Sequence, residues 1–283
     1  MKKFRIALGQ ICGLRMTREA LREQMSYMAA EAAEQGAELI LFPELSSIGY
    51  FHSQTELELL TGADDSDFIA WATRLSQKNR IGICAGYAEH AAGQRYNTSL
   101  LTGRNGEIVG KVRKVHLWKS EKKRFAAGNE YPVFETEFGK LAVLLCYDME
   151  FPEPARIAAL RGAELILCPA AWSKPAENRW RLALPASALF NLCFVAGANY
   201  SDALCCGGSA VYGPDGAALT VAEEGEALVI TELDPERVRQ QRETLPYFQD
   251  LRAEDMELLL SGARQHLLTQ EKCEDFRRQG KER

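Results

Sequence analysis

Two nearly identical segments constrain the fold of this chain more than any other feature of its sequence. Residues 36–44 read GAELILFPE, and residues 162–170 read GAELILCPA. Each copy begins with a glycine that suits the end of a helix, continues as an unbroken apolar run and then reaches a proline. Unbroken apolar runs of this length are typical of strands buried on both faces. Because no stretch rich in Pro, Gly or Ser separates the copies, we expect one α/β domain built on two sheets with outer helices.

Strand-like and helix-like segments alternate around the two copies. Apolar patterning predicts strands at 4–11, 37–42, 81–89, 97–102, 106–115, 141–147, 163–168, 193–200, 208–213, 217–222 and 227–233. Helical periodicity predicts helices from Thr17 to Gly36, at 56–78, 154–161 and 176–191, and from Asp234-Pro235 onward. An Asn-Gly pair at 105–106 predicts a hairpin. About the last forty residues are polar with a helical pattern, so we expect them to form an arm.

Composition argues against several classes of function. The chain has 283 residues, 46% hydrophobic and 26% charged, and its net charge of -5 with no Lys/Arg-rich run speaks against nucleic-acid binding. No run approaches the roughly 18–20 apolar residues of a membrane span. The N-terminal MKKFRIALGQICG is interpreted as a strand rather than a signal peptide, so we expect a cytoplasmic protein without membrane contact. The eight cysteines include no CxxC pair and no Cys/His zinc spacing, which predicts a reducing compartment and no metal site.

Three segments place ionisable side chains where buried strands end, the position at which open α/β sheets carry reactive groups. Glu44 is the last residue of the first copy of the repeat, directly after its proline, whereas the second copy has Ala170 at the same place. The fold therefore does not need an acid there. Lys114 alternates with apolar residues in KVRKVHLW, and Cys146 closes the apolar run LLC before Tyr147-Asp148 begins a turn.

A thiol, a carboxylate and an ammonium form a chemically sensible set. A nearby cation is expected to lower the thiol pKa, and the carboxylate can take the thiol proton and pass it to a leaving amine. The ammonium and a backbone N–H can stabilise an oxyanion, so no metal or organic cofactor is required. Each residue also has a purely structural interpretation: Cys146 as core filler, Lys114 as a solvated strand residue and Glu44 as a turn cap.

The motifs resemble those of the nitrilase, or carbon–nitrogen hydrolase, superfamily, in its order. FPE at 42–44 is similar to the motif of the catalytic glutamate, RKVHL at 113–117 to that of the catalytic lysine, and CYDMEFPE at 146–153 to that of the nucleophile. EKKRFAAG at 121–128 resembles the segment with a second glutamate, which falls on Glu121. GGSAVYGPDG at 207–216 and RETLPYFQDLR at 242–252 extend the likeness to residues 4–252.

The resemblance implies a four-layer αββα sandwich, with the hydrolase domain at 1–255 and a helical tail at 256–283. It implies a homodimer or higher homo-oligomer paired across a helical face, and a small-molecule substrate. Cys146 is implied to form a thioester, with Glu44 as general base. Lys114 and the Tyr147 N–H are implied to stabilise the oxyanion, and Glu121 to position substrate or water.

The branch of the superfamily is indicated by Cys146-Tyr147-Asp148, since true nitrilases typically carry Cys-Trp-Glu there. An amidase acting on linear amides with release of ammonia is favoured. An N-carbamoyl (ureido) amidohydrolase, a true nitrilase and a silent binding protein remain as alternatives. Glu150 stands where many amidase-like relatives have Arg. An acid near the pocket would favour an amine-bearing substrate, unless Glu150 simply pairs with Arg156 or another surface base.

For several other residues the sequence leaves two interpretations open. Tyr50, Trp118 and Trp172 lie just beyond motifs or strand ends and either line the substrate site or belong to the core. Cys205-Cys206 is interpreted as strand packing, and His116 as a buried or orienting residue. At 185–191, Ser187 and Phe190 replace a charged pair common among relatives, a change expected to affect pocket shape more than catalysis.

Overall fold

The computed structural model describes residues 2–13, 16–50 and 65–279. The chain separates into a unit from Met1 to Thr244 and a second unit from Leu245 to Arg283. The second unit contains helix α7 (Ala253–Gln279). Within the described ranges no helix combines the length and the apolar character needed to cross a membrane.

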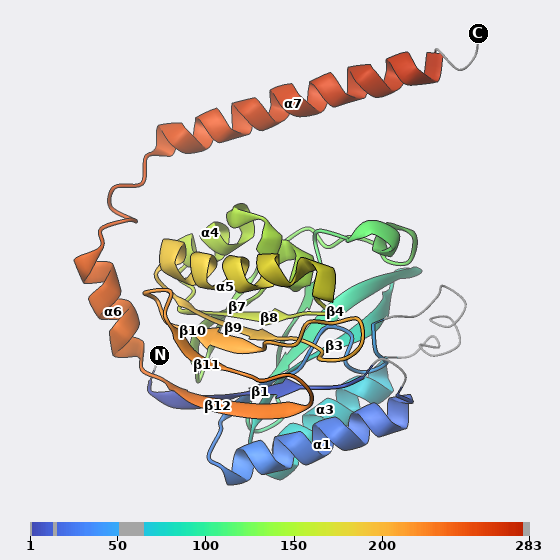
Figure 1. Cartoon of the computed structure of the whole chain (residues 1–283), viewed down its shortest axis with the longest axis vertical. Helices are drawn as coiled ribbons and strands as arrows, with labels where there is room; N and C mark the ends of the chain where they lie inside the picture. Colours follow the sequence, from blue (N-terminus) through green and yellow to red (C-terminus); the bar gives the residue numbers. More distant parts are fainter. Residues whose placement is uncertain (1, 14–15, 51–64, 280–283) are drawn as a thin grey trace. The chain divides into compact units, whose positions relative to one another are not determined.

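Two six-stranded sheets form the first unit. The first sheet runs β12 (Ala227–Leu233), β1 (Phe4–Gln10), β2 (Leu39–Leu41), β3 (Gly82–Ala91), β4 (Gln94–Thr102) and β5 (Ile108–Arg113). The second sheet runs β11 (Ala218–Val221), β10 (Ala210–Tyr212), β9 (Phe194–Ala198), β8 (Leu165–Pro169), β7 (Gly139–Val143) and β6 (Val133–Thr136). Helices α1 (Arg18–Glu34) and α3 (Ser66–Asn79) cover one outer face, and α4 (Pro152–Leu160) and α5 (Glu177–Asn191) cover the other (Figure 1). The predicted four-layer αββα sandwich is confirmed.

The internal repeat extends to the topology. In the first sheet, neighbouring strands are parallel from β1 to β3 and antiparallel from β3 to β5. In the second sheet, neighbouring strands are likewise parallel from β7 to β9 and antiparallel from β9 to β11. Strands β2 and β8, which contain the two copies, are wholly buried. The copies meet at their carboxyl ends, where the Glu44 N–H donates to the Ala170 carbonyl oxygen at 3.4 Å.

Side chains of β2 and β8 alternate between two apolar cores. Leu39 and Leu41 of β2, with Leu165 and Leu167 of β8, pack between the sheets. Ile40 packs instead toward the helices on its own side, as the alternation of a strand requires. Every position of these strands therefore has an apolar environment, which is why the repeat is apolar without interruption.

Several element boundaries differ from the predictions. Strand β6 was not predicted, because its VFET segment is short and forms the edge of its sheet. The strand predicted at 141–147 ends at Val143, since the backbone turns before Cys146. The strand predicted at 106–115 ends at Arg113, and Lys114 directly after it still donates its N–H to the Asn97 carbonyl oxygen of β4 at 2.8 Å. The helix predicted at 56–78 is α3 from Ser66, and its first residues lie outside the described ranges.

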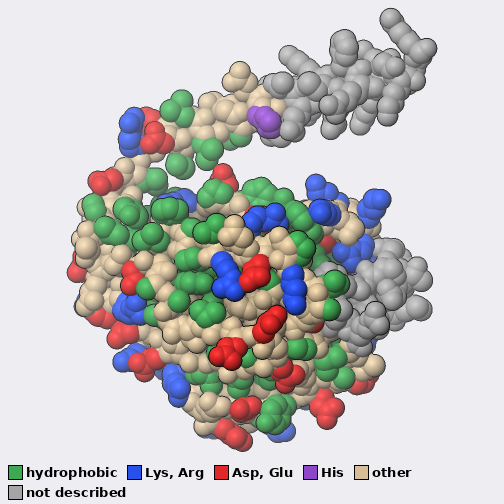
Figure 2. Space-filling view, viewed as in Figure 1, with side chains coloured by type: hydrophobic (Ala, Val, Ile, Leu, Met, Phe, Trp, Pro, Cys, Tyr) green, Lys and Arg blue, Asp and Glu red, His purple; other side chains and the backbone are tan. Residues whose placement is uncertain are grey.

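Hydrophobic side chains gather over α4 and α5 on the face seen in Figure 2. On these helices the exposed apolar side chains are Leu160, Leu182 and Phe190, which we call the α4–α5 face. Phe190, one of the two residues that depart from the common charged pair, is 56% exposed, whereas Ser187 is buried.

Candidate active site

The three ionisable residues singled out in the sequence leave the sheets at neighbouring points. Glu44 lies in the turn after β2, and Lys114 directly follows β5. Cys146 begins the short 3-10 helix η2 (Cys146–Glu150), which follows β7. Glu121 lies in a second such turn, η1 (Lys119–Lys123). The folded chain thus brings together side chains that are far apart in sequence.

Lys114 is completely buried between two carboxylates. Its Nζ lies 2.6 Å from Glu44 Oε1 and 2.9 Å from Glu121 Oε2, and none of the three side chains has exposed surface. The alternative of a solvated strand lysine is therefore wrong. A buried charge of this kind is tolerated only when it is paired, so the two carboxylates hold the ammonium at a fixed point.

Further hydrogen bonds fix the two carboxylates. Asn97 Nδ2 donates to Glu44 Oε1 at 2.7 Å and to Glu121 Oε1 at 3.2 Å. The Tyr50 hydroxyl donates to Glu121 Oε1 at 3.0 Å. Asn97 was missed in the sequence analysis, because a single asparagine within a strand carries no motif of its own.

The second oxygen of each carboxylate accepts from backbone. The Ala171 N–H donates to Glu44 Oε2 at 3.1 Å, and the Trp118 N–H donates to Glu121 Oε2 at 2.6 Å. Ala171 follows the second copy of the repeat, so Glu44 bonds across the sandwich to the other half. Glu44 is therefore more than a local turn cap.

The backbone around the site is strained. Leu45, Lys119 and Cys146 have φ values of 48°, 41° and 45°, in the left-handed region that side chains with a Cβ rarely adopt. Such strain is concentrated where the surrounding structure holds a functional group in place. Gly86 allows the turn after Glu44 to approach β3, since a Cβ there would lie 2.2 Å from the Leu45 nitrogen.

Burial dominates the electrostatics of the cluster. It raises the pKa of the Glu44 carboxyl, and the Glu121 charge adds to the rise, against the opposing effects of Lys114 and Asn97. Burial alone would lower the pKa of Lys114, but Glu44 and Glu121 outweigh it, so the pKa stands well above its ordinary value. Glu44 is thus a stronger base than an ordinary carboxylate, and Lys114 stays protonated.

The thiol of Cys146 does not follow the sequence-based expectation of a lowered pKa. Burial first, and the Glu44 carboxylate second, raise the pKa of Cys146 well above its usual value, although Lys114 acts in the opposite direction. The cation acts in the expected direction, but burial and the Glu44 charge outweigh it, so the net pKa is raised. The thiol therefore needs a base in order to react.

His116 connects the lysine segment to the cysteine segment. The buried Asp148 carboxylate accepts from the His116 N–H at 2.8 Å and lies 2.9 Å from His116 Nδ1 through the same oxygen. The His116 ring stacks on Phe151 with centroids 3.9 Å apart. The side chain is 32% exposed, so the alternative of a buried His116 is wrong, and its contacts with Asp148 and Phe151 are compatible with the predicted orienting role.

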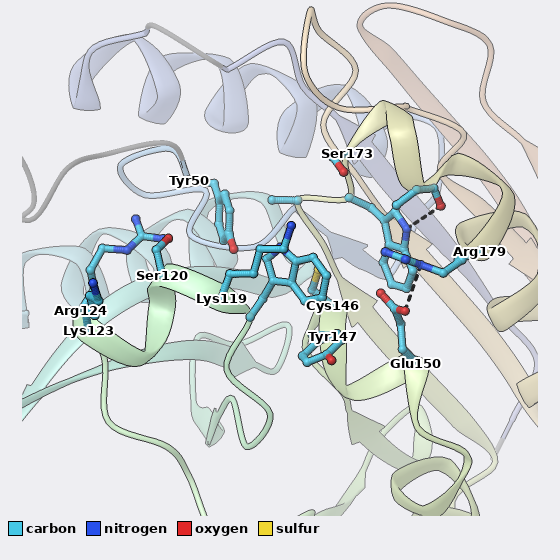
Figure 3. Close-up of a pocket in the computed structure, with 14 residues that line it drawn as sticks. Tyr50, Lys119, Ser120, Lys123, Arg124, Cys146, Tyr147, Glu150, Ser173 and Arg179 are labelled. Atoms are coloured by element: carbon cyan, nitrogen blue, oxygen red, sulfur yellow. Dashed lines mark hydrogen bonds and ion pairs between the residues drawn. The ribbon is translucent and has the colours of Figure 1, made fainter. Parts of the chain in front are cut away.

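A pocket of about 570 Å³ opens at Cys146. All five predicted pocket residues line it, namely Tyr50, Trp118, Tyr147, Glu150 and Trp172 (Figure 3). Residues that the sequence analysis missed line it as well: Lys119, Ser120, Lys123, Arg124, Ala171, Ser173, Ala176 and Arg179. Lys123 and Arg124 belong to the EKKRFAAG segment but had no assigned role there, and the other six lie outside the motifs, so the folded arrangement identifies them.

Glu150 is paired within this pocket. Its Oε2 lies 3.0 Å from Arg179 Nε of helix α5. The alternative of an ion pair is therefore confirmed, with Arg179 rather than Arg156 as the base. Burial raises the pKa of Glu150, and Arg179 opposes the rise.

The neighbouring pair Cys205-Cys206 was the other cysteine feature considered in the sequence. Each lies outside the named strands and takes part in one isolated backbone β-bridge, Cys205 with Ser173 and Cys206 with Ser201. The interpretation as strand packing was therefore wrong. In the part of the chain that the structure describes, no group of three His, Cys, Asp or Glu side chains could hold a metal ion. The chemistry supported by the site is that of a thiol beside a base and a fixed ammonium.

Comparisons with known proteins agree on one relationship. The profile of the family described as carbon-nitrogen hydrolase matches residues 5–243. The deaminated glutathione amidase of Escherichia coli is 33% identical over 244 residues, which are 82% of this chain and 91% of that protein. The chloroplastic omega-amidase of Arabidopsis thaliana is 32% identical over 270 residues, covering 87% and 72% of the two chains. A solved amidase from Nesterenkonia sp. AN1 superimposes with a TM-score of 0.81 at 31% identity, covering 90% and 99%.

Proposed function

Since this chain belongs to the carbon-nitrogen hydrolase family, as an amidase-type hydrolase, we propose that it hydrolyses a small amide to ammonia and a carboxylic acid through a thioester on Cys146. The observation that carries the proposal is the buried Glu44–Lys114–Glu121 cluster, whose Glu44 and Lys114 charges act on Cys146, together with a pocket that opens on Cys146. A core without chemistry would gain nothing from burying three charges.

In the first step the Cys146 sulfur attacks the amide carbonyl carbon. Glu44 takes the thiol proton, which its raised pKa favours. The carbonyl oxygen gains negative charge and is stabilised by the Lys114 ammonium and the Tyr147 N–H at the start of η2. Lys114 does not serve as the base, because its raised pKa keeps it protonated.

In the second step Glu44 returns the proton to the leaving nitrogen, the C–N bond breaks and ammonia departs. A thioester remains on Cys146. Water then attacks the thioester with Glu44 again as base, and the carboxylic acid leaves with restoration of the thiol. Glu121, fixed by Tyr50 and the Trp118 N–H, holds Lys114 and positions the reacting water or amide.

A related protein supports the covalent step. A variant of the Nesterenkonia sp. AN1 amidase has been solved with the acetamide moiety of fluoroacetamide covalently added at its active site cysteine. That observation belongs to the relative, and for the present chain it motivates the assignment of Cys146 as nucleophile.

The test is ammonia release from aliphatic amides, omega-amides, amino-acid amides, N-carbamoyl compounds and nitriles. Wild type is compared with Cys146→Ala, and Cys206→Ala serves as a matched control outside the pocket lining. We expect turnover of amides that is lost in Cys146→Ala and kept in Cys206→Ala. Turnover of nitriles alone, or full activity in Cys146→Ala, would overturn the proposal.

A further inference from the structure

The walls of the pocket are strongly basic although the chain is acidic. Lys119, Lys123, Arg124 and Arg179 line the pocket against one lining acid, Glu150, which gives 4 − 1 = +3. The whole chain has a net charge of -5. A cleft that reverses the sign of its protein attracts ligands of the opposite charge.

Arg179 is held in place on two sides. Its Nε pairs with Glu150 at 3.0 Å, and its Cζ lies 5.8 Å from the centre of the Trp118 ring. The Glu150 side chain is 20% exposed and that of Arg179 51%, so the acid sits deeper and the guanidinium reaches toward solvent. The ion pair with Glu150 is through Nε. The two terminal nitrogens of a guanidinium have the geometry that matches a carboxylate.

A second cation contacts the same ring. Lys119 Nζ lies 4.8 Å from the centre of the Trp118 ring, on a residue whose backbone is held at a φ of 41°. Lys123 and Arg124 lie at the opposite end of the pocket from Arg179, with Cys146 between (Figure 3). Arg124 there contacts the rings of Tyr50 and Phe125.

We propose that the amide substrate carries a carboxylate on its non-reacting end, and that Arg179, assisted by Lys119, binds this carboxylate while Cys146 attacks the amide. The inference rests on the proposed amidase function and names its substrate class. It replaces the sequence-based expectation of an amine-bearing substrate. Glu150 cannot attract an amine as a lone acid would, because Arg179 already compensates its charge.

Glu150 and Arg179 therefore act as one unit in this chain. Where many amidase-like relatives place an arginine at the position of Glu150, this chain supplies the guanidinium from α5 and uses the acid to orient it. Arg179 is a specificity-determining residue under this proposal, and Glu150 is a positioning residue.

The experiment uses amides that differ in terminal charge. Glutaramic acid is the anionic probe, pentanamide the neutral one and 5-aminopentanamide the cationic one. We expect kcat/KM to be highest for glutaramic acid, by about tenfold over pentanamide, as for a charge-assisted hydrogen bond in a partly exposed site. Added salt should reduce this ratio, since screening weakens the attraction.

Substitutions locate the source of the preference. Arg179→Gln should reduce the ratio of glutaramic acid to pentanamide to about threefold or less, and Lys119→Gln should reduce it by a smaller factor. The matched control is Arg181→Gln on the same helix, because Arg181 also pairs with a glutamate, Glu177, yet does not line the pocket. This control should leave the ratio at its wild-type value.

The outcomes separate the two proposals. Ammonia release from no amide at all would overturn the amidase function itself. Turnover of all three probes at similar kcat/KM, or an unchanged ratio in Arg179→Gln, would overturn only the carboxylate site. A preference for 5-aminopentanamide that disappears in Glu150→Gln would overturn it in favour of the amine-bearing substrate.

Discussion

Replacing Glu44 by Gln removes the proposed base while keeping the size and shape of the side chain. The dependence on this base follows from the thiol. Burial and the Glu44 carboxylate hold the pKa of Cys146 well above its ordinary value, so the protonated thiol predominates at neutral pH. Without Glu44 the attack loses its proton acceptor in both steps. We expect kcat/KM to fall on the order of 10³-fold, within the 10²- to 10⁴-fold range typical of general-base removal.

The stability of Glu44→Gln follows from two opposing terms. In wild type one Glu44 oxygen accepts hydrogen bonds from Lys114 and Asn97, and the other accepts from the Ala171 N–H. A Gln side chain has only one acceptor oxygen, so at least one of these hydrogen bonds is lost, at a cost of about 1–3 kcal/mol in stability. The substitution also removes a carboxyl whose pKa is raised by burial. We therefore expect a change of no more than about 2 kcal/mol in the free energy of unfolding.

The difference in stability between Glu44→Gln and wild type should change with pH in a definite direction. A carboxyl with a raised folded-state pKa binds its proton more tightly when folded, so its contribution to stability declines as pH rises from 4.5 through the folded-state value. Gln has no such decline. The stability of the variant relative to wild type should therefore improve from acidic to neutral pH.

The assay combines steady-state ammonia release with urea unfolding at several pH values. Alkylation of Cys146 by iodoacetamide, followed by peptide mass spectrometry, reports the reactivity of the thiol itself and should slow with the loss of the base. A folded Glu44→Gln protein that retains more than about a tenth of wild-type kcat/KM would refute the role of Glu44 as base, given the range expected for such a group.

Three further predictions concern neighbouring features. Lys114→Met leaves two buried carboxylates without their cation and should cost about 3–5 kcal/mol of stability, more at pH 8 than at pH 5, by urea unfolding; equal stability at pH 8 would contradict the buried ion network. Gly86→Ala forces the turn at Leu45 to move and should lower kcat/KM about tenfold or more with a stability loss of about 1–3 kcal/mol; unchanged kinetics would show that the turn adjusts freely. We expect the homodimer that the family resemblance implies to pair through the exposed α4–α5 face, so Leu182→Glu should yield monomers in analytical ultracentrifugation; an unchanged oligomer would place the interface elsewhere, and a monomeric wild type would contradict the expected pairing.

The sequence predicted the parts of the fold that depend on local pattern. The apolar runs at 37–42 and 163–168 contain the central strands β2 and β8. They could be predicted because a strand buried on both faces is apolar at every position rather than at every second one. The reactive residues were predicted from motif resemblance, and the five proposed pocket residues do line the pocket. The short edge strand β6 carried too few residues for a pattern.

What the sequence could not give is the balance of charges after folding. Whether the pKa of Cys146 is raised or lowered depends on its burial and on the balance between Glu44 and Lys114. Both arise from residues far from Cys146 in the sequence, so no local pattern reveals them. The same holds for Arg179, which reaches Glu150 only because α5 packs beside η2. Asn97 likewise bonds to Glu44 and Glu121 from a strand that sequence reasoning treated as scaffold.

The repeat explains why the sandwich has one such centre rather than two. Leu39 and Leu165 occupy the same position in the two copies of the repeat, and they pair with Ile6 and Leu141, respectively. Ile6 and Leu141 are therefore equivalent. The same offset makes Ile11 equivalent to Cys146.

The same correspondence makes Ala170 equivalent to Glu44. Each half thus supplies one reactive side chain and has a buried apolar residue at the other's position. A second acid at 170 would join Glu44 and Glu121 in the interior with one lysine between three carboxylates, and the added burial of charge would favour protonation of the base. Asymmetry at these two positions therefore keeps Glu44 able to accept the proton of Cys146.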